Sequence, residues 1–343
     1  MAIEGPLVPR NVTTVLSLDD VRLAGRTVLY RVDVNSPLDP STGAFLDDSR
    51  LRSTLDTLNN LSDSKVVIMG HQSRPGKIDF TDMAGHSDRL SRLIGQQIQF
   101  VEDICGDEAI AAIEEMQPGE KVFINNVRMH PEEYGENKVR AEDESTSEIV
   151  TRLSSVADAY VTDAFGAAHR NSPTLTGFTE EIPCIAGRLM NKEIRSLSLA
   201  VNDPPRPYVA ILGGAKCDDS LRVALNLIGR EVVDSIVMVG VVGNLMLWAD
   251  GHDIGRGNKE AIKAMMGDDF EPTWKMAEQL AKEHSELLFL PRDVAVEVDE
   301  KRNQMELDNL PTDYPIYDIG IETLQDLRTL LNGANCILWN GPA

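Results

Sequence analysis

Short apolar runs rich in β-branched residues alternate with longer amphipathic stretches, and most of these runs stop abruptly at Gly, Asn, Asp or Pro. This alternation is typical of βαβ units, in which helices connect parallel strands. It predicts an α/β fold with parallel sheets flanked by helices. The runs that we expect to form strands are Thr27–Val34, Val66–Met69, Gln97–Val101, Val122–Ile124 and Ala159–Thr162 in the first half, and Tyr208–Leu212, Ile236–Val239, Leu287–Leu290 and Ile337–Trp339 in the second.

The length of the chain predicts two domains. A single core rarely grows beyond about 250–300 residues, and this chain has 343. Between the two series of strands lies Ala186–Asp203, an amphipathic stretch that is followed by two prolines and that we expect to form a helix. We therefore expect two Rossmann-like domains, residues 1–185 and 186–343, which this hinge helix joins.

The charge balance excludes two classes of partner. The chain carries 55 acidic and 33 basic residues, a formal net charge of −22, which would repel nucleic acid and anionic membranes. Only 11 of the basic residues are lysines. A surface that is rich in Asp and poor in Lys suggests a cytoplasm of high salt, where the Debye length falls to about 3 Å at 1 M and repulsion is screened.

The sequence shows no targeting signal, membrane span or paired cysteines, and this predicts a soluble, cytoplasmic protein. The N-terminal sequence MAIEGPLVPRN contains no apolar core of a signal peptide. The longest apolar stretch, Ile236–Trp248, is shorter than the ~18 residues that a membrane span needs. The four cysteines form no C-x-x-C pair, so we expect them to be small buried residues and neither zinc ligands nor disulfides.

Four predicted strands of the first half each lead to an arginine. In open α/β sheets, ligands bind beyond the carboxyl ends of the strands, where these arginines lie. Several guanidinium groups that converge there would hold a small polyanion. The alternative is that each arginine pairs with a nearby Asp or Glu at the surface. The four residues are Arg50, Arg74, Arg128 and Arg170.

The second half opens with Gly213-Gly214-Ala215-Lys216 at the end of a predicted strand, before an amphipathic run. Glycines permit close approach of the backbone, a helix N-terminus supplies N–H groups, and a lysine adds positive charge, which together suit a phosphate. Gly70–Lys77 is not a Walker A motif, because five residues separate its glycines and Ile78 stands where Ser or Thr is required.

Together these segments resemble the phosphoglycerate kinases over almost the whole chain. Seven segments occur in the family's order and at family-like spacing, and Gly240–Asn244 resembles the archaeal branch. The seven are RVDVNSP (Arg31–Pro37), GHQSRP (Gly70–Pro75), NNVRMHPEE (Asn125–Glu133), DAFGAAHR (Asp163–Arg170), LGGAK (Leu212–Lys216), LPRD (Leu290–Asp293) and WNGP (Trp339–Pro342).

The resemblance implies reversible phosphoryl transfer between 1,3-bisphosphoglycerate with MgADP and 3-phosphoglycerate with MgATP, a reaction of glycolysis and gluconeogenesis. It implies that the N-terminal domain binds the phosphoglycerate and the C-terminal domain binds ATP or ADP. It also implies hinge closure, with Mg²⁺ brought in with the nucleotide. We expect a monomer.

The resemblance also implies roles for individual residues. Asp33 and Asn35 would contact the hydroxyl and carboxylate region of the glycerate. Arg74, Arg128 and Arg170 would bind its phosphate, with His71 beside them. The catalytic candidates are Arg50 and Lys216, which would approach the transferring phosphoryl group. The residues that would line the nucleotide are Gly213, Gly214, Lys216, Gly240, Asn340 and Pro342, and none of the residues assigned is a metal ligand.

Three departures from the family pattern concern the site. Asn125 replaces an acidic residue, which we expect to be tolerated, and Ser220 stands where many members have a second lysine. After Ala343 the family continues with a Gly-Gly-Gly-Asp-Ser/Thr loop whose Asp holds Mg²⁺. We expect the sequence to be incomplete, and a chain without that loop to bind phosphoglycerate but to bind MgATP poorly.

Two other functions compete with the kinase. A non-catalytic phosphoglycerate-binding homologue would keep the anion site of the first half while lacking the last loop of the nucleotide side. A nucleotide-dependent oxidoreductase is disfavoured, because no G-x-G-x-x-G follows a predicted strand.

The most charged segment, His130–Glu148, is expected to be a solvated loop and the start of a helix.

Overall fold

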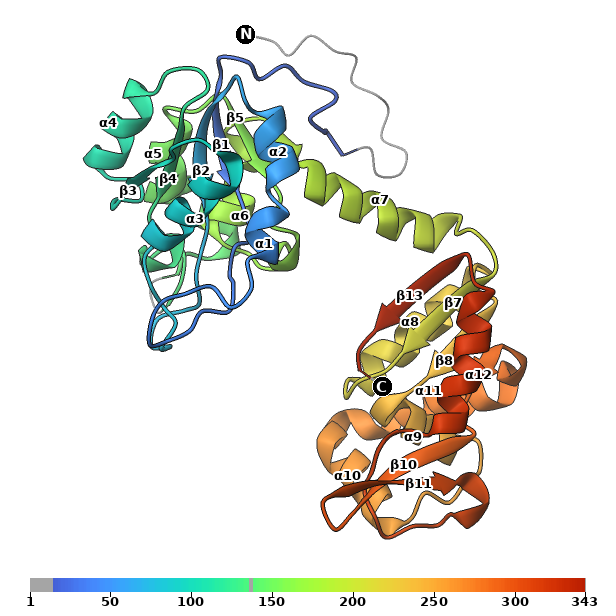
Figure 1. The fold of residues 1–343 in the computed structure, drawn as a ribbon. Coiled ribbons are helices and arrows are strands. Elements are labelled where there is room, and N and C mark those ends of the chain that lie inside the picture. The colour runs from blue at the N-terminus through green and yellow to red at the C-terminus, as the bar shows by residue number, and fades with distance from the viewer. Residues whose placement is uncertain (1–14, 136–137, 343) are drawn as a thin grey trace. The chain divides into compact units, whose positions relative to one another are not determined.

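The computed structural model describes residues 15–135 and 138–342. The chain forms two compact units, Met1–Arg195 and Ser196–Ala343, and the division falls inside helix α7 (Arg188–Asn202). This helix carries the chain from the first unit into the second (Figure 1). The expected helix over Ala186–Asp203 is therefore present, with its ends shifted by one or two residues.

The first unit is built on a six-stranded sheet with the order β3-β4-β2-β1-β5-β6, and every pair of neighbours is parallel. Each of the five strands predicted for this half is present, although β1 stops at Arg31, three residues before the predicted end. The strands are β1 (Thr27–Arg31), β2 (Lys65–Met69), β3 (Gln99–Val101), β4 (Lys121–Ile124), β5 (Ala159–Thr162) and β6 (Cys184–Ala186).

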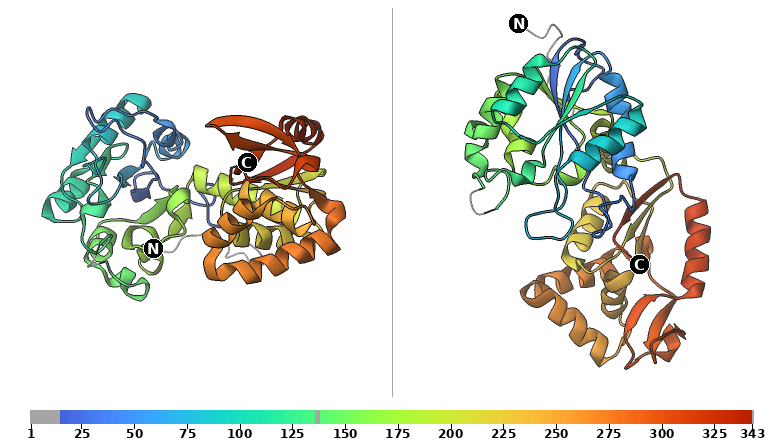
Figure 2. Two further views of the ribbon diagram at one scale, coloured as in Figure 1. Left: turned by 90° about the horizontal axis from the view of Figure 1, so that it is seen from below. Right: turned by 60° about the vertical axis from the view of Figure 1, so that its left-hand side comes forward.

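Helices cover both faces of this sheet (Figure 2). Alternate strand residues face opposite cores: Leu29 belongs to the core beneath α4 and α5, and Val28 to the core beneath α1, α2 and α3. Burial on both faces explains why the strands are continuous apolar runs and not alternating ones. The α-helices are α1 (Ser49–Arg52), α2 (Leu55–Asn60), α3 (Ala84–Ile94), α4 (Asp107–Glu115), α5 (Glu148–Ser154) and α6 (Pro173–Thr176).

The second unit contains a four-stranded parallel sheet of order β13-β7-β8-β9. Its strands are β7 (Tyr208–Leu212), β8 (Ser235–Met238), β9 (Leu288–Phe289) and β13 (Cys336–Asn340). Its helices are α8 (Cys217–Gly229), α9 (Gly240–Ala249), α10 (Arg256–Met266), α11 (Phe270–Glu283) and α12 (Ile321–Asn332). The apolar stretch Ile236–Trp248 is thus the end of β8 followed by most of α9.

A second, antiparallel sheet of order β11-β10-β12 was not predicted. Its strands are β10 (Asp293–Val298), β11 (Lys301–Glu306) and β12 (Ile316–Ile319). The sequence of β11 is KRNQME and most of its residues are exposed, so no apolar pattern marks it as a strand. It is a strand because its backbone pairs with β10 from Lys301 to Glu306.

All four cysteines are free. Cys105 and Cys217 are buried as predicted, whereas Cys184 and Cys336 are half-buried. Burial raises the pKa of the Cys105 thiol to about 12. Within the described ranges, no helix is both long enough and apolar enough to cross a membrane.

Candidate functional site

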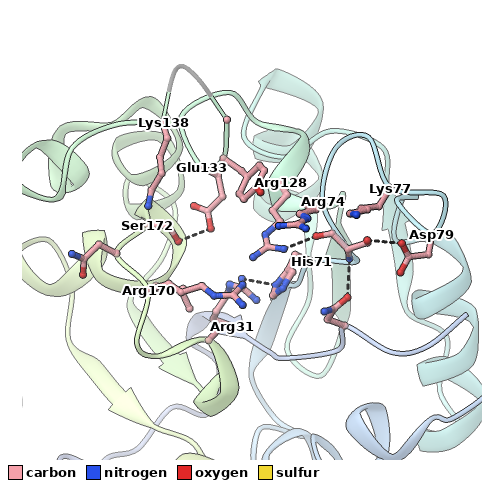
Figure 3. Close-up of a pocket in the computed structure, with 17 residues that line it drawn as sticks. Arg31, His71, Arg74, Lys77, Asp79, Arg128, Glu133, Lys138, Arg170 and Ser172 are labelled. Carbon is pink, nitrogen blue, oxygen red and sulfur yellow. Dashed lines mark hydrogen bonds between the residues drawn. The ribbon is translucent and has the colours of Figure 1, made fainter. Parts of the chain in front are cut away.

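The four strands predicted to lead to arginines are neighbours in the sheet. Strands β4, β2, β1 and β5 lie side by side, so their carboxyl ends and the loops that follow them share one edge. A pocket of about 860 Å³ opens at this edge and is lined by residues of all four loops (Figure 3). This is where an open α/β sheet binds its ligand.

Positive charge dominates the pocket of an otherwise acidic protein. Two carboxylates, Asp79 and Glu133, line it against six basic side chains: Arg31, Arg74, Lys77, Arg128, Lys138 and Arg170. Among the described residues, Arg31, Arg74, Arg128 and Arg170 form no ion pair with any carboxylate, while arginines elsewhere do, such as Arg26 with Asp158 and Arg206 with Asp234. Surface pairing, the alternative for these arginines, therefore does not apply to Arg74, Arg128 and Arg170.

Arg31 is the last residue of β1 and is almost fully buried, with 1% of its surface exposed. Its Nε donates to Thr174 Oγ1 (3.0 Å), its Nη1 to the carbonyl of Val32 (2.5 Å), and its Nη2 lies 3.1 Å from His71 Nδ1. Burial and then the neighbouring charge of Arg31 lower the pKa of His71 to about 2. His71 is therefore neutral across the physiological range.

Side chains tie together the loops that follow β1, β2 and β4. Asn35 Oδ1 accepts a 2.8 Å hydrogen bond from the backbone N–H of Ser73, and Arg128 Nη1 donates to the carbonyl of Ser73 at 2.5 Å. Asn126 Nδ2 donates to the carbonyls of Gln72 and Thr81. Burial, followed by the charge of Arg170, lowers the pKa of Arg128. The loops thus hold several cations close together at an energetic cost that an anion would offset.

Asp33 and Arg50 form their own ion pair beside the pocket. Arg50 Nη1 lies 2.5 Å from Asp33 Oδ2, and neither residue lines the pocket itself. Gly166 lies against this pair, since a Cβ placed there would be 2.5 Å from Asp33 Oδ2. Of the seven residues expected to bind substrate, five line the pocket: Asn35, His71, Arg74, Arg128 and Arg170.

The residues expected to bind nucleotide gather at the carboxyl edge of the second parallel sheet, after β7, β8 and β13. The N–H groups of Gly213 and Gly214 are occupied there, because they donate to the carbonyls of Asn340 (2.7 Å) and Pro342 (2.8 Å). A Cβ at Gly213 would collide with the Pro342 carbonyl. These two glycines therefore permit close approach of two segments of the same chain.

Lys216 lies at the N-terminal end of α8 and is exposed. The first turn of α8 carries two carboxylates, Asp218 and Asp219, and no side chain caps it. Ser220 is buried, and its hydroxyl donates to the carbonyl of Gly213 at 3.4 Å. Gly240, with a φ of 61°, is the first residue of α9 and follows β8 directly.

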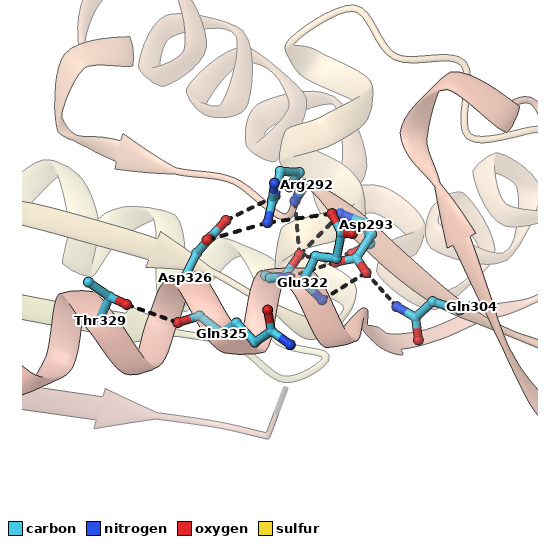
Figure 4. A network of polar contacts seen from close by, with 8 residues as sticks. Arg292, Asp293, Gln304, Glu322, Gln325, Asp326 and Thr329 are labelled. Atoms are coloured by element: carbon cyan, nitrogen blue, oxygen red, sulfur yellow. Dashed lines mark hydrogen bonds and ion pairs between the residues drawn. The ribbon is translucent and has the colours of Figure 1, made fainter.

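The LPRD segment has a structural role in the second unit (Figure 4). Asp293 is buried and accepts hydrogen bonds from the backbone N–H groups of Glu322 (3.0 Å) and Thr323 (2.7 Å), at the start of α12. Although burial opposes ionisation, hydrogen bonds led by that from the Thr323 hydroxyl hold the pKa of Asp293 below its ordinary value. Asp293 therefore caps α12 from a distant strand.

The expectation of a solvated loop over His130–Glu148 is wrong for two of its glutamates. Glu133 is 4% exposed and accepts hydrogen bonds from the hydroxyls of Ser172 (2.8 Å) and Thr174 (2.6 Å). Glu144 is 3% exposed and contacts Thr176. Two carboxylates of the segment therefore satisfy buried donors, and its sequence carries no signal of this.

Sequence reasoning also missed Arg31. A single arginine at the end of a mainly apolar strand is the signal that could have found it, because a buried guanidinium needs several hydrogen-bond partners. Within the described ranges, no group of three or more His, Cys, Asp or Glu side chains could hold a metal ion.

Comparisons with known proteins point to one family. The family model described as "Phosphoglycerate kinase" matches residues 18–343. A phosphoglycerate kinase of Methanocorpusculum labreanum is 40% identical over 327 residues, which cover 95% of this chain and 80% of that protein. One of Methanothermus fervidus is 41% identical over 331 residues, covering 95% of this chain and 79% of that protein. The crystal structure of phosphoglycerate kinase from Pyrococcus horikoshii OT3 matches with a TM-score of 0.81 at 35% identity, covering 95% of this chain and 80% of that chain.

Proposed function

The chain belongs to the phosphoglycerate kinase family, and we propose that the pocket at the ends of β4, β2, β1 and β5 binds the phosphoglycerate, while the carboxyl edge of β13, β7 and β8 binds the nucleotide. Its activity is reversible phosphoryl transfer between 1,3-bisphosphoglycerate with ADP and 3-phosphoglycerate with ATP. No comparison supports the alternative of a non-catalytic homologue.

One observation carries the assignment of the first pocket, namely the arginines that line it and find no carboxylate among the described residues. A phosphoglycerate carries a phosphate and a carboxylate, and planar guanidinium groups match both through pairs of N–H donors. Arg74, Arg128 and Arg170 provide these donors, and Asn35 and His71 add polar atoms at the same strand ends.

The Asp33–Arg50 pair suits a second task. Phosphoryl transfer needs little covalent chemistry from the protein, because positioning and neutralisation of charge on the equatorial oxygens supply most of the rate. Asp33 orients the guanidinium of Arg50, and we assign to Arg50 and Lys216 the stabilisation of charge on the transferring group. The other oxygen of Asp33, Oδ1, accepts only a long hydrogen bond of 3.4 Å from the backbone N–H of Asn35. It therefore keeps acceptor capacity for a glycerate hydroxyl.

Magnesium fits the proposed nucleotide site, at the carboxyl edge of β13, β7 and β8, only together with the nucleotide. Mg²⁺ in kinases is usually held by one or two carboxylates plus substrate phosphates, and the described residues contain no cluster of three or more ligating side chains. We propose that Mg²⁺ arrives bound to the phosphates of ATP or ADP, where it would offset their charge. Lys216, at the N-terminus of α8, and Gly240, at the N-terminus of α9, lie at the strand ends that would meet these phosphates.

Further elements of the proposal come from the composition and from family membership. The net charge of −22 supports the proposal that the protein functions in a cytoplasm of high salt concentration. We propose that the chain acts as a monomer, that residues 1–185 and 186–343 are its functional domains, and that hinge bending at α7 accompanies turnover.

Two measurements test the proposal. ATP formation from 1,3-bisphosphoglycerate and MgADP should be detected with the purified full-length protein in a coupled assay. Calorimetry should show binding of 3-phosphoglycerate that Arg128→Ala weakens strongly and Arg256→Ala leaves unchanged, since Arg256 is exposed on α10. Absence of turnover together with intact 3-phosphoglycerate binding would favour the non-catalytic alternative.

A further inference from the structure

Four buried side chains form a continuous line of hydrogen bonds along the wall of the phosphoglycerate pocket. Glu133 Oε1 contacts Thr174 Oγ1 at 2.6 Å, Thr174 Oγ1 contacts Arg31 Nε at 3.0 Å, and Arg31 Nη2 lies 3.1 Å from His71 Nδ1. The four residues are between 0% and 4% exposed. They come from four separate segments of the chain, so only the fold brings them together.

The chemistry of these groups determines the direction of every hydrogen bond in the line. A carboxylate only accepts, so the single hydroxyl proton of Thr174 is donated to Glu133. The oxygen of Thr174 is then an acceptor for the Nε–H of Arg31. A guanidinium has no acceptor atom, so Arg31 must also donate at Nη2, and His71 Nδ1 must accept. The neutral ring then carries its proton on Nε2.

We propose that Glu133, acting through Thr174 and Arg31, holds His71 in the tautomer whose proton is on Nε2, so that His71 binds an anionic oxygen of the substrate as a neutral hydrogen-bond donor. Glu133 and Thr174 are then positioning residues for the known reaction. The identity of the bound anion rests on the proposed function, whereas the tautomer does not.

The other possible states of His71 are unfavourable in this environment. The tautomer with a proton on Nδ1 would set an N–H against the N–H of Arg31, and a flipped ring would offer that N–H a carbon atom. Either state leaves a buried donor of Arg31 without a partner, which is costly. A cationic ring would face four guanidinium groups, those of Arg31, Arg128, Arg170 and Arg50, which together with burial oppose its protonation.

The consequence for function concerns pH. An exposed histidine titrates near pH 6.5 and would change its contribution to anion binding across the physiological range. A neutral donor keeps the same hydrogen-bonding capacity from about pH 5 to about pH 9, where its partner Arg31 also stays charged. The glutamate that directs this arrangement lies in the loop after β4, two hydrogen bonds away from Arg31 Nε and three away from His71.

The tautomer can be measured without any variant. In ¹⁵N-histidine-labelled protein without ligand, the ring nitrogens of His71 are identified by the signals that His71→Gln removes. We expect Nδ1 to show the shift of an unprotonated nitrogen and Nε2 that of a protonated one, unchanged from about pH 5 to about pH 8. A cationic ring near pH 6, or a proton on Nδ1, would overturn the proposal.

We call the line of hydrogen bonds from Glu133 through Thr174 and Arg31 to His71 the relay. Its role is tested at Thr174. Thr174→Val keeps the shape of the side chain but removes the hydroxyl, and Thr174→Ser restores it. We expect Thr174→Val to raise KM for 3-phosphoglycerate on the order of tenfold, with kcat lowered much less, and to mix the His71 tautomers. Thr174→Ser should behave like the unmodified protein. Glu133→Gln, which places an amide N–H among donors, should act in the same direction as Thr174→Val.

Thr273→Val is the matched control, because Thr273 is a fully buried threonine of α11 whose hydroxyl bonds a backbone carbonyl in the second unit. It should lower stability but change neither KM nor the His71 signals. If Thr174→Val leaves both the tautomer and KM unchanged, the relay is wrong. If His71 shows the expected tautomer but 3-phosphoglycerate does not bind the unmodified protein, the assignment of the substrate fails and the relay stands.

Discussion

The carboxylate of Asp163, immediately after β5, accepts a 2.9 Å hydrogen bond from the backbone N–H of Met190 in the first turn of α7. The same carboxylate accepts from the hydroxyls of Tyr30 (2.6 Å) and Thr57 (2.5 Å). A Cβ at Gly187 would collide with it. The start of α7 is therefore tied to β1, α2 and β5 by a single buried side chain, that of the first residue of the DAFG segment.

Replacing Asp163 should destabilise the first unit. Asp163→Ala removes the acceptor of three buried donors, of which the Tyr30 hydroxyl alone has a second acceptor in reach among the described residues, the carbonyl of Thr54 at 3.4 Å. We expect a loss of about 3 kcal/mol in the free energy of unfolding, from 1–3 kcal/mol per unsatisfied group. The urea midpoint followed by circular dichroism measures it. Asp56→Ala, which removes an exposed carboxylate of α2, should change the midpoint little. Equal midpoints for the two variants would contradict the role assigned to Asp163.

Arg170 should contribute to substrate binding more than to stability. Its charge is felt by both His71 and Arg128, and it pairs with no carboxylate among the described residues. Arg170→Ala should raise Kd for 3-phosphoglycerate by about ten- to a hundredfold, the range for a lost charge-assisted hydrogen bond. Calorimetry measures this. Arg256→Ala changes the net charge equally and should leave Kd unaltered, so an equal loss in both variants would mean that long-range charge alone matters.

Lys216 should act on the transition state. Lys216 is exposed at the N-terminal end of α8, where its ammonium group would meet charge that develops on the transferring phosphoryl group. Lys216→Ala should lower kcat by about 10²–10³ while KM for either substrate changes only a few-fold. Steady-state kinetics of the coupled reaction, with Lys275→Ala on α11 as the control, gives both values. A rise in KM at constant kcat would instead assign Lys216 to ground-state binding.

Asp293 should make the free energy of unfolding of the second unit depend on pH in the acidic range. Its folded pKa lies below the ordinary value of 3.8, so the carboxylate contributes stability above that value. The contribution is lost as the pH falls through the lowered folded pKa. Asp293→Asn should lower the free energy of unfolding by about 1.5–3 kcal/mol near neutral pH, and the difference should narrow below about pH 4.

Urea titrations at several pH values test this prediction, with Asp326→Asn as the control. Asp326 is a partly exposed residue of α12 that pairs with Arg292. Its replacement by Asn should lower the free energy of unfolding by less than about 1 kcal/mol. A difference between Asp293→Asn and the unmodified protein that stays constant down to pH 3 would show that the charge of Asp293 contributes nothing.

Salt should stabilise the whole protein. A formal net charge of −22 makes the surface repel itself, and at about 1 M salt the Debye length contracts to about 3 Å. The melting temperature should therefore rise between about 0.1 M and about 2 M KCl. A flat or falling curve would contradict the inference of a high-salt environment.

The strands were predictable because their signal is local. Ala159–Thr162 and Tyr208–Leu212 are β5 and β7 with the bounds read from the sequence, since a run of apolar residues buried on both faces stands out against its neighbours. Strand β11 was not predictable, because its exposed polar residues carry no pattern and only pairing with β10 makes it a strand.

The sequence by itself determined the class of fold, the family and the strand ends where cations gather. The signals for these are the apolar runs and the family motifs, and each of them lies within a few consecutive residues. Only the tertiary structure decided which of those cations are left without a carboxylate. Arg50 pairs with Asp33, 17 residues away, whereas Arg31 is held by Thr174, 143 residues away, and Glu133 by Ser172, 39 residues away. Such contacts depend on the order of strands in the sheet, and local propensity carries no information about partners that far along the chain.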